Sequence, residues 1–357
     1  MLKRVSWTTA VPLVALVVLA ATLGLETGPV LSVLEAVFLT GAVLAAVHHA
    51  EVVAHRVGEP FGSLVLAAAV TVIEVTLILA LMASGGNQAA TLARDTVFAA
   101  VMITMNGIVG LSLLVGAVRY GLARFNAEGS GAAVSTVATL AAVCLVLPTF
   151  TTSARGPVYS ASQLTFAAVT SVALYSLFVL TQTGRHRDFF VPPGELTDAT
   201  RAGASETRAA VRSLVLLALA LTAVVGLAKV ESPSIERAVT AAGLPDSFVG
   251  VAIAAVILLP ETLAAVRNAL RDRIQISLNL AYGSAMASIG LTIPAVAVAT
   301  MWLDRSLILG LGTTQIALLT LTAVVSTLTV VPGRATRLQG ALHLVLAGIF
   351  VFLAINP

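Results

Sequence analysis

The sequence predicts an all-α integral membrane protein of about 11 transmembrane helices, organised as one N-terminal helix followed by two inverted five-helix repeats. Hydrophobic residues make up 58% of the 357 residues and charged ones only 10%, whereas soluble domains carry about 25% charged residues. Apolar runs of about 18–25 residues recur, the length that crosses roughly 30 Å of hydrocarbon as a helix. Unusual polar residues also recur in the same order in both halves of the chain.

The composition excludes several other classes of protein. Transmembrane barrels show short alternating segments, which this sequence lacks, and its mean hydropathy is +1.00. The net charge of +3 does not indicate nucleic-acid binding, because basic residues of membrane proteins collect in cytoplasmic loops. Cys144 is the single cysteine, so an intrachain disulfide and a cysteine metal cluster are both excluded. We expect no cofactor, and the lipid bilayer as the surrounding partner.

The first apolar run follows the basic start "MLKRVSW" and could be a signal peptide or a retained helix. We interpret it as a retained helix, because it is long for a signal and no clear cleavage site precedes a soluble domain. The remaining spans follow in order and are separated by polar or glycine-containing turns. The eleven expected spans are 8–25, 29–48, 61–83, 96–118, 132–150, 158–182, 210–229, 246–267, 274–300, 306–330 and 337–355.

The longest polar stretch divides the chain into its expected parts. It is rich in proline, charged and small residues, which mark a loop. With the N-terminus inside, fifteen of the 20 Lys and Arg residues face the cytoplasm, which predicts the N-terminus inside and the C-terminus outside. The expected parts are an N-terminal helix (1–28), a first repeat (29–182), a cytoplasmic loop (183–209) and a second repeat (210–357).

Five helices in each half indicate an inverted duplication, since an odd number makes the halves enter the membrane from opposite sides. Glu74 lies in the second helix of the first half and Glu261 in the second helix of the second half. The following helix of each half begins beside an Arg-Asp pair, and polar or small residues stand eleven positions beyond each Asp. These matched pairs are Arg94-Asp95 with Arg271-Asp272, and Asn106-Gly107 with Gly283-Ser284.

Glu74 and Glu261 are the main candidates for a functional site. A carboxylate near the bilayer centre costs about 2.5–3.5 kcal/mol on insertion scales, so it usually faces the protein interior and serves a pathway or a pair. A single such residue could be a protonated glutamate held by one hydrogen bond. Two at matching positions favour a shared cavity that holds either a cation such as Ca²⁺ or protons, which is what an exchanger requires.

Neutral oxygen atoms near the two acids could complete a cation shell. Thr71 lies one turn before Glu74, and Pro260 precedes Glu261, where it should free a backbone carbonyl near Val256 and bend the helix. The alternative for the other candidates is close helix packing through small residues. Those other candidates are Asn106, Asn279, Ser284 and Ser288.

A cluster of titratable residues is expected at the cytoplasmic end of the second span. His49, Glu51, His55 and Glu59 could form a cation entrance or proton relay, or simply a solvated helix end. Their spacing differs from the His-Glu-x-x-His pattern of zinc hydrolases, so we do not expect an enzyme. Glu35 and His343 are expected to be structural or lipid-facing oddities.

Long stretches of the sequence carry a family resemblance. They are "HAEVVAHRVGEPFGSLVLAAAVTVIEVTLILALMASG" (His49–Gly85), followed by "TLARDT", and "FVGVAIAAVILLPETLAAVRNAL" (Phe248–Leu270), followed by "NLAYGSAMASIGLTIP". The chain resembles the calcium/cation antiporter superfamily, and within it the bacterial calcium/proton antiporters of the ChaA type. The resemblance implies that Glu74 and Glu261 bind cation and protons, and that Gly283-Ser284 matches the family's glycine-serine pair after the second acid.

The expected function is therefore Ca²⁺/H⁺ exchange across the cytoplasmic membrane of a prokaryote by alternating access. The alternatives are Na⁺/H⁺ or K⁺/H⁺ exchange at the same site, then Na⁺/Ca²⁺ exchange, then a cation channel. A channel fits less well, because selectivity sites are usually rings from identical subunits rather than two unique acids.

Overall fold

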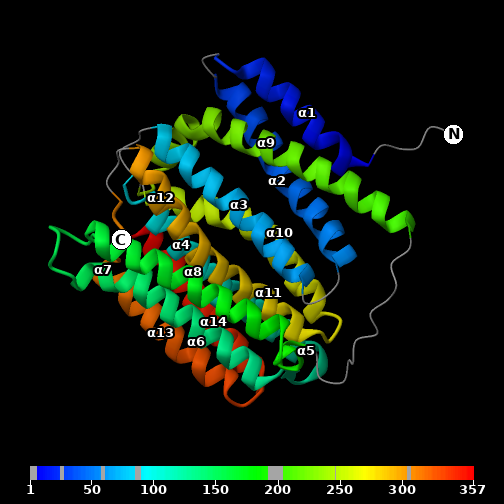
Figure 1. Ribbon diagram of the computed structural model, residues 1–357, viewed down its shortest axis with the longest axis vertical. Coiled ribbons are helices and arrows are strands. Elements are labelled where there is room, and N and C mark those ends of the chain that lie inside the picture. The colour runs from blue at the N-terminus through cyan, green and yellow to red at the C-terminus, as the bar shows by residue number, and fades with distance from the viewer. Residues whose placement is uncertain are drawn as a thin grey trace. The chain divides into compact units, whose positions relative to one another are not determined.

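The computed structural model describes residues 6–24, 28–57, 61–84, 90–191, 204–245, 247–303 and 307–357 (Figure 1). The chain forms two compact units, which are considered separately below. Unit 1 contains residues 1–89 and 198–246, and unit 2 contains residues 90–197 and 247–357. Each unit is therefore assembled from two separate segments of the chain.

Every one of the eleven expected spans corresponds to a helical segment, which confirms the all-helical membrane fold. Within the described residues, nine helices are long and apolar enough to cross a membrane, and two further apolar helices (Trp7–Thr22 and Ala68–Ala80) are shorter. Several bounds differ from expectation. The second span continues to Val57, the seventh covers Ala204–Ala241, and the tenth begins only at Thr313. Polar residues extend helices beyond the apolar window, since backbone hydrogen bonding continues where water replaces lipid.

The described residues of unit 1 form four helices: α1 (Trp7–Thr22), α2 (Pro29–Val57), α3 (Phe61–Ser84) and α9 (Ala204–Ala241). Figure 1 shows α2 and α9 side by side, and these two helices form the largest contact of the unit. Hydrogen bonds join Ser32 to Ser234 and His49 to Ser213, so α2 and α9 are antiparallel. α1 also packs against both α2 and α9. A Cβ atom at Gly226 of α9 would collide with Leu19 of α1, so glycine permits this close approach.

The core of unit 2 is built from three long helical segments. The first runs through α4 (Leu92–Met102), the π-helical η1 (Ile103–Ile108) and α5 (Val109–Tyr120). The second is α10 (Phe248–Ala269), and the third joins α11 (Ile274–Ala287), the π-helical η4 (Ser288–Thr292) and α12 (Ile293–Leu303). α10 packs against α4, α5, η1 and α11, so it joins the first of these segments to the third.

The outer helices of unit 2 surround this core. They are α6 (Ala127–Ala141) with η2 (Ala142–Val146) and α7 (Leu147–Phe150), then α8 (Ala161–Thr183), α13 (Thr313–Val330) and α14 (Arg337–Ile355). A short helix, η3 (Arg187–Phe190), and a two-residue antiparallel ladder between β1 (Ala123–Arg124) and β2 (Arg334–Ala335) close the loops.

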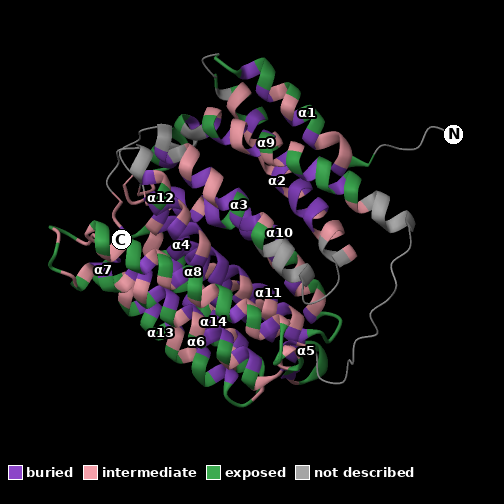
Figure 2. Cartoon of the chain, in the orientation of Figure 1, coloured by how far each residue is buried: buried purple, intermediate pink, exposed green. Residues whose placement is uncertain are grey.

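Burial separates the core of unit 2 from its surface. Figure 2 shows α4 mainly in the colour of buried residues, whereas α8 and α14 alternate buried with exposed positions. The exposed positions include large apolar side chains, such as Phe166 (71% exposed) and Phe352 (63%). Large apolar side chains on an outer helix face are expected where the solvent is lipid.

The two compact units do not coincide with the two predicted repeats. Unit 1 takes the first two helices of the first repeat and the first helix of the second, together with the N-terminal helix α1. The third helix of each repeat carries a π-helical stretch, but not at matching positions: Ile103 lies eight residues beyond Asp95, and Ser288 lies sixteen beyond Asp272. Any duplication has therefore diverged in its local helix geometry.

Candidate functional site

Glu261 lies in the interior of unit 2, near the centre of α10, and is 1% exposed. The hydroxyl of Ser284 on α11 donates a hydrogen bond of 2.7 Å to Glu261 Oε2. A hydrogen bond to a carboxylate favours the ionised form and fixes the position of its oxygen atoms. The Ser284 oxygen keeps its lone pairs, so the two side chains together offer oxygen ligands of the kind that hard cations prefer.

Gly250 allows α10 to approach α4 closely. A Cβ atom at this position would lie 2.9 Å from the carbonyl carbon of Asp95 and 2.9 Å from the amide nitrogen of Thr96. Asp95 is itself held by an ion pair of 2.8 Å with Arg94. Pro260 lies inside α10, which continues as a helix on both sides of it, and Val256 is 37% exposed while Glu261 is buried. The predicted carbonyl ligand at Val256 stays a prediction.

Glu74 lies in unit 1, within the apolar helix α3, and is 2% exposed. Thr71, one turn earlier on the same helix, is 6% exposed. Positions three apart share a helix face, so the hydroxyl and the carboxylate can face the same space. Each unit thus buries one of the two predicted acids with a nearby hydroxyl group.

Asn106 takes part in a buried network of unit 2 that the sequence did not predict. It lies in η1, and its Nδ2 donates to Thr322 Oγ1 on α13 over 2.9 Å. Its Oδ1 lies 3.2 Å from Nδ1 of His343, whose Nε2 lies 3.2 Å from Thr329 Oγ1. With Asn106 Oδ1 as acceptor, Nδ1 of His343 carries the proton and Nε2 accepts from the threonine. His343 is 0% exposed and bonded at both ring nitrogens, so of the two expected alternatives it is structural rather than lipid-facing.

The other neutral candidates on α11 differ in their surroundings. Ser288 opens the π-helical η4 and is 2% exposed, and π-helical turns are frequent at functional sites. A Cβ atom at Gly283 would meet nothing within 4 Å, so open space lies beside it. Asn279 instead donates a hydrogen bond of 2.6 Å to the carbonyl of Phe190 and accepts one of 2.8 Å from the side chain of Gln275. The bond to Phe190 joins α11 to η3, and the bond from Gln275 already occupies one lone pair of the Asn279 Oδ1 atom.

The expected cytoplasmic cluster is only partly described. α2 extends past the predicted end of its span, so His49 lies inside the helix and is 4% exposed, rather than at a solvated end. Its Nε2 lies 2.9 Å from the carbonyl of Thr8, and its Nδ1 lies 3.3 Å from Ser213 Oγ. Glu51 is half-buried in the same helix. The side chain of His55 and the whole of Glu59 lie outside the described residues.

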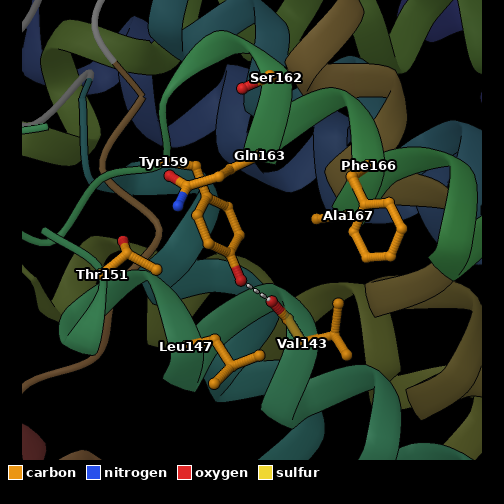
Figure 3. Close-up of a pocket in the computed structure, with 8 residues that line it drawn as sticks. All are labelled: Val143, Leu147, Thr151, Tyr159, Ser162, Gln163, Phe166 and Ala167. Atoms are coloured by element: carbon orange, nitrogen blue, oxygen red, sulfur yellow. Dashed lines mark hydrogen bonds between the residues drawn. The ribbon is translucent and has the colours of Figure 1, made fainter. Parts of the chain in front are cut away.

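A separate pocket of about 320 Å³ lies in unit 2 between η2, α7 and the start of α8 (Figure 3). The hydroxyl of Tyr159 donates a hydrogen bond of 2.5 Å to the carbonyl of Val143, drawn as a dashed line in Figure 3. Burial raises the pKa of this phenol to about 12. The Gln163 side chain caps its own helix at Ser160 and donates to Ser153. The pocket lining carries no acid, so it offers no charged ligand for a cation.

Buried polar groups held inside apolar helices are typical of membrane transporters. The described residues contain no group of three or more His, Cys, Asp or Glu side chains that could hold a metal. The chain is a membrane-embedded ion exchanger rather than an enzyme. The profile of the sodium/calcium exchanger protein family matches residues 27–184 and 212–356, and the chain belongs to this family. The two matched segments nearly coincide with the two predicted repeats.

Two relatives match almost the full length of the chain. A protein of Sinorhizobium fredii (strain NBRC 101917 / NGR234), y4hA, to which ion transport is attributed, is 45% identical over 355 residues, covering 98% of this chain and 96% of the relative. The sodium-potassium/proton antiporter ChaA of Escherichia coli (strain K12) is 34% identical over 341 residues, covering 94% and 92%.

Solved structures share the fold at low sequence identity. Native YfkE superposes with a TM-score of 0.73 at 15% identity, covering 98% of this chain and 99% of YfkE. The H⁺/Ca²⁺ exchanger CAX superposes with a TM-score of 0.68 at 14% identity, covering 98% and 91%. The resemblance to calcium/cation antiporters is confirmed at the level of family and fold.

Proposed function

We propose that the protein is a cation/proton antiporter in which Glu74 and Glu261 bind either Ca²⁺ or protons. The observation that carries this proposal is the Ser284–Glu261 hydrogen bond, because it places a carboxylate and a hydroxyl oxygen together inside an apolar core. A carboxylate in such surroundings needs a counter-charge, which can be a bound cation or a proton. Holding one or the other, but not both, would couple the two fluxes.

Glu74 is the second acid of the proposal. It occupies the second helix of its repeat, as Glu261 does, and both are at least 98% buried by their exposed fractions of 2% and 1%. In transporters built from inverted repeats, substrate sites lie near the bilayer midplane where the repeats meet. The double match of the exchanger family profile supports such a duplication here.

Calcium is the proposed cation because carboxylate, hydroxyl and carbonyl oxygens suit a hard divalent ion, which takes six to eight of them. Ser288, Thr71 and the open space beside Gly283 are candidates for the remaining ligands or for the gating movement. The name H⁺/Ca²⁺ exchanger for CAX supports the same choice.

Exchange of Na⁺ or K⁺ for protons is the second candidate, and one observation favours it. The relative that is 34% identical over most of the chain is named a sodium-potassium/proton antiporter. The same two acids would serve, because a monovalent cation also neutralises carboxylate charge. We further propose a prokaryotic cytoplasmic membrane as the location, with the N-terminus inside, on the basis of the Lys and Arg distribution.

The test uses proteoliposomes that contain the purified chain and an imposed proton gradient. Ca²⁺, Na⁺ and K⁺ are added separately while the luminal pH is followed. We expect proton movement on adding Ca²⁺, and its loss in Glu74→Gln and in Glu261→Gln, which keep the side-chain volume but remove the charge. A response to Na⁺ or K⁺ alone would select the second candidate. Wild-type rates from either variant would refute the two-acid mechanism.

The cytoplasmic cluster is tested in the same assay. Glu59→Gln is expected to slow exchange or change its pH profile if Glu59 lies at the entrance with His49, Glu51 and His55. The matched control is Glu128→Gln, which removes an exposed carboxylate from the first turn of α6. An unchanged rate and pH profile for Glu59→Gln would assign the cluster to a solvated helix end.

A further inference from the structure

Unit 1 contains a second pair of acids that the proposed transport site does not use. Glu35 lies in the second turn of α2 and is 0% exposed, and Glu231 lies near the end of α9 and is 4% exposed. Of the two alternatives expected for Glu35, structural or lipid-facing, its burial excludes the lipid-facing one. α2 and α9 lie side by side, as Figure 1 shows, and the Ser32–Ser234 hydrogen bond fixes an antiparallel register in which Glu35 and Glu231 stand opposite each other.

Two ionised carboxylates at these opposed, buried positions would repel each other. An ionised carboxylate only accepts hydrogen bonds, so a hydrogen bond between the two groups requires a proton on one of them. Among the described residues, no donor reaches either oxygen of Glu35 or the Oε2 atom of Glu231, and all three atoms are buried. A single proton between the groups would supply the missing donor and remove one of two neighbouring negative charges.

The nearest cations of α9 are Arg237 and the exposed Lys229, two residues from Glu231, and neither donates a hydrogen bond to the pair. Arg237 attracts Glu231 electrostatically, but its guanidinium donates hydrogen bonds to Ser234 and to the Pro233 carbonyl rather than to either acid. α1, which packs against both helices, carries no charged residue. The only charged residue of α3 is Glu74, which is also an acid.

We propose that Glu35 and Glu231 form a proton-binding site between α2 and α9, separate from Glu74 and Glu261, which holds one proton shared by the two carboxyl groups. The Ser32–Ser234 hydrogen bond of 2.9 Å lies one turn further along both helices and holds them in this register. Loss of the proton would leave two carboxylates in contact inside an apolar interface, so proton binding at this site stabilises the packing of α2 against α9.

The test measures bound protons directly and does not depend on transport. Infrared difference spectra are recorded between low and high pH on the full-length chain, in a Glu74→Gln/Glu261→Gln background that removes the other two buried glutamates of the proposal. We expect a carbonyl band of a protonated carboxyl group that shifts on deuteration, corresponding to one proton per chain. Glu35→Gln and Glu231→Gln should each move the pH range of this band, and the double variant should lose it.

Three results would overturn the proposal. One is a band that persists at full intensity in the Glu35→Gln/Glu231→Gln variant. Another is a pair of independent signals, so that each single substitution removes one and leaves the pH range of the other unchanged. The third is loss of the band when Ca²⁺ or Na⁺ is added at constant pH, which would make the pair a cation site. The deuterium shift can also be measured with Glu35 and Glu231 both unsubstituted. If no carbonyl band shifts on deuteration in that protein, the proposal is overturned as well.

Discussion

The contact of α10 with α4 gives a quantitative test of how Glu261 is positioned. In Gly250→Ala, the new methyl group would lie 2.9 Å from the carbonyl carbon of Asp95. Carbon atoms in van der Waals contact are about 3.5–4.0 Å apart, so the helices must separate locally by about 0.6–1.1 Å. Both nearest atoms belong to the backbone of α4, so no flexible side chain can move aside to accept the methyl group.

The expected energetic cost follows from two opposing effects. Replacing glycine by alanine inside a helix stabilises it by up to about 1 kcal/mol. Overpacking a well-packed contact typically costs about 1–3 kcal/mol. Gly348→Ala on α14 is the matched control, because a Cβ atom there meets nothing within 4 Å. Gly348→Ala, in the interior of α14, shows the helix effect without the close contact, so Gly250→Ala should be less stable than Gly348→Ala by about 1–3 kcal/mol.

The assay compares thermal unfolding of the two purified variants in lipid and cation-driven proton movement in proteoliposomes. We expect a lower melting temperature for Gly250→Ala and slower exchange, because α10 also carries Glu261 and a displacement near 1 Å can cost about 100-fold in activity. Gly348→Ala should keep the wild-type rate. If Gly250→Ala matched Gly348→Ala in both measurements, the close approach of α10 to α4 would not position the acid.

Three further substitutions test individual contacts. Ser284→Ala should weaken apparent cation affinity about 10- to 100-fold, since hydrogen bonds to charged groups contribute about 1.5–3 kcal/mol. Ser284→Thr keeps the hydroxyl and is the control. An unchanged cation affinity for Ser284→Ala would remove Ser284 from the site. His343→Leu should destabilise the chain by about 1–3 kcal/mol for each polar group left unpaired, and His343→Gln should be closer to wild type. Equal melting temperatures for His343→Leu and wild type would contradict this prediction. Tyr159→Phe should cost about 0.5–1.5 kcal/mol through the lost bond to Val143. Because the phenol pKa is raised from 10.0 to about 12, this stabilisation is fully present below pH 10 and is lost as the pH rises through about 12. A difference in the free energy of unfolding between wild type and Tyr159→Phe that stayed constant over that pH range would refute the prediction.

The sequence predicted the helical segments well because each is a local property of the chain. An apolar run of sufficient length partitions into lipid whatever its neighbours are, so all eleven expected spans appear as helices. Helix ends were less predictable: α9 covers Ala204–Ala241 where an apolar window suggested 210–229, because polar residues continue a helix outside the apolar window. Buried charge was also visible in the sequence, since Glu74 and Glu261 stand alone in hydrocarbon.

The surroundings of individual polar residues could not be predicted in the same way. Asn106 was a candidate for cation ligation or for close helix packing, and its amide bonds to Thr322 and His343, which are 216 and 237 residues away in the chain. His49 was expected near a solvated end, yet it lies between α1, α2 and α9. His343, the lone histidine of the last span, indicated a buried hydrogen-bond partner. The identity of that partner depends on which helix lies opposite.

The sequence alone thus determined the class of this protein, its span order and the two acids of its proposed transport site, because hydropathy and isolated charge act through the lipid solvent. Only the tertiary structure decided that Ser284 bonds to Glu261, that Asn106 joins His343, and that Glu35 stands opposite Glu231. Those pairings depend on the rotation and register of helices distant in the chain. A shift of one helix by a single residue turns its face by about 100° and would separate each pair.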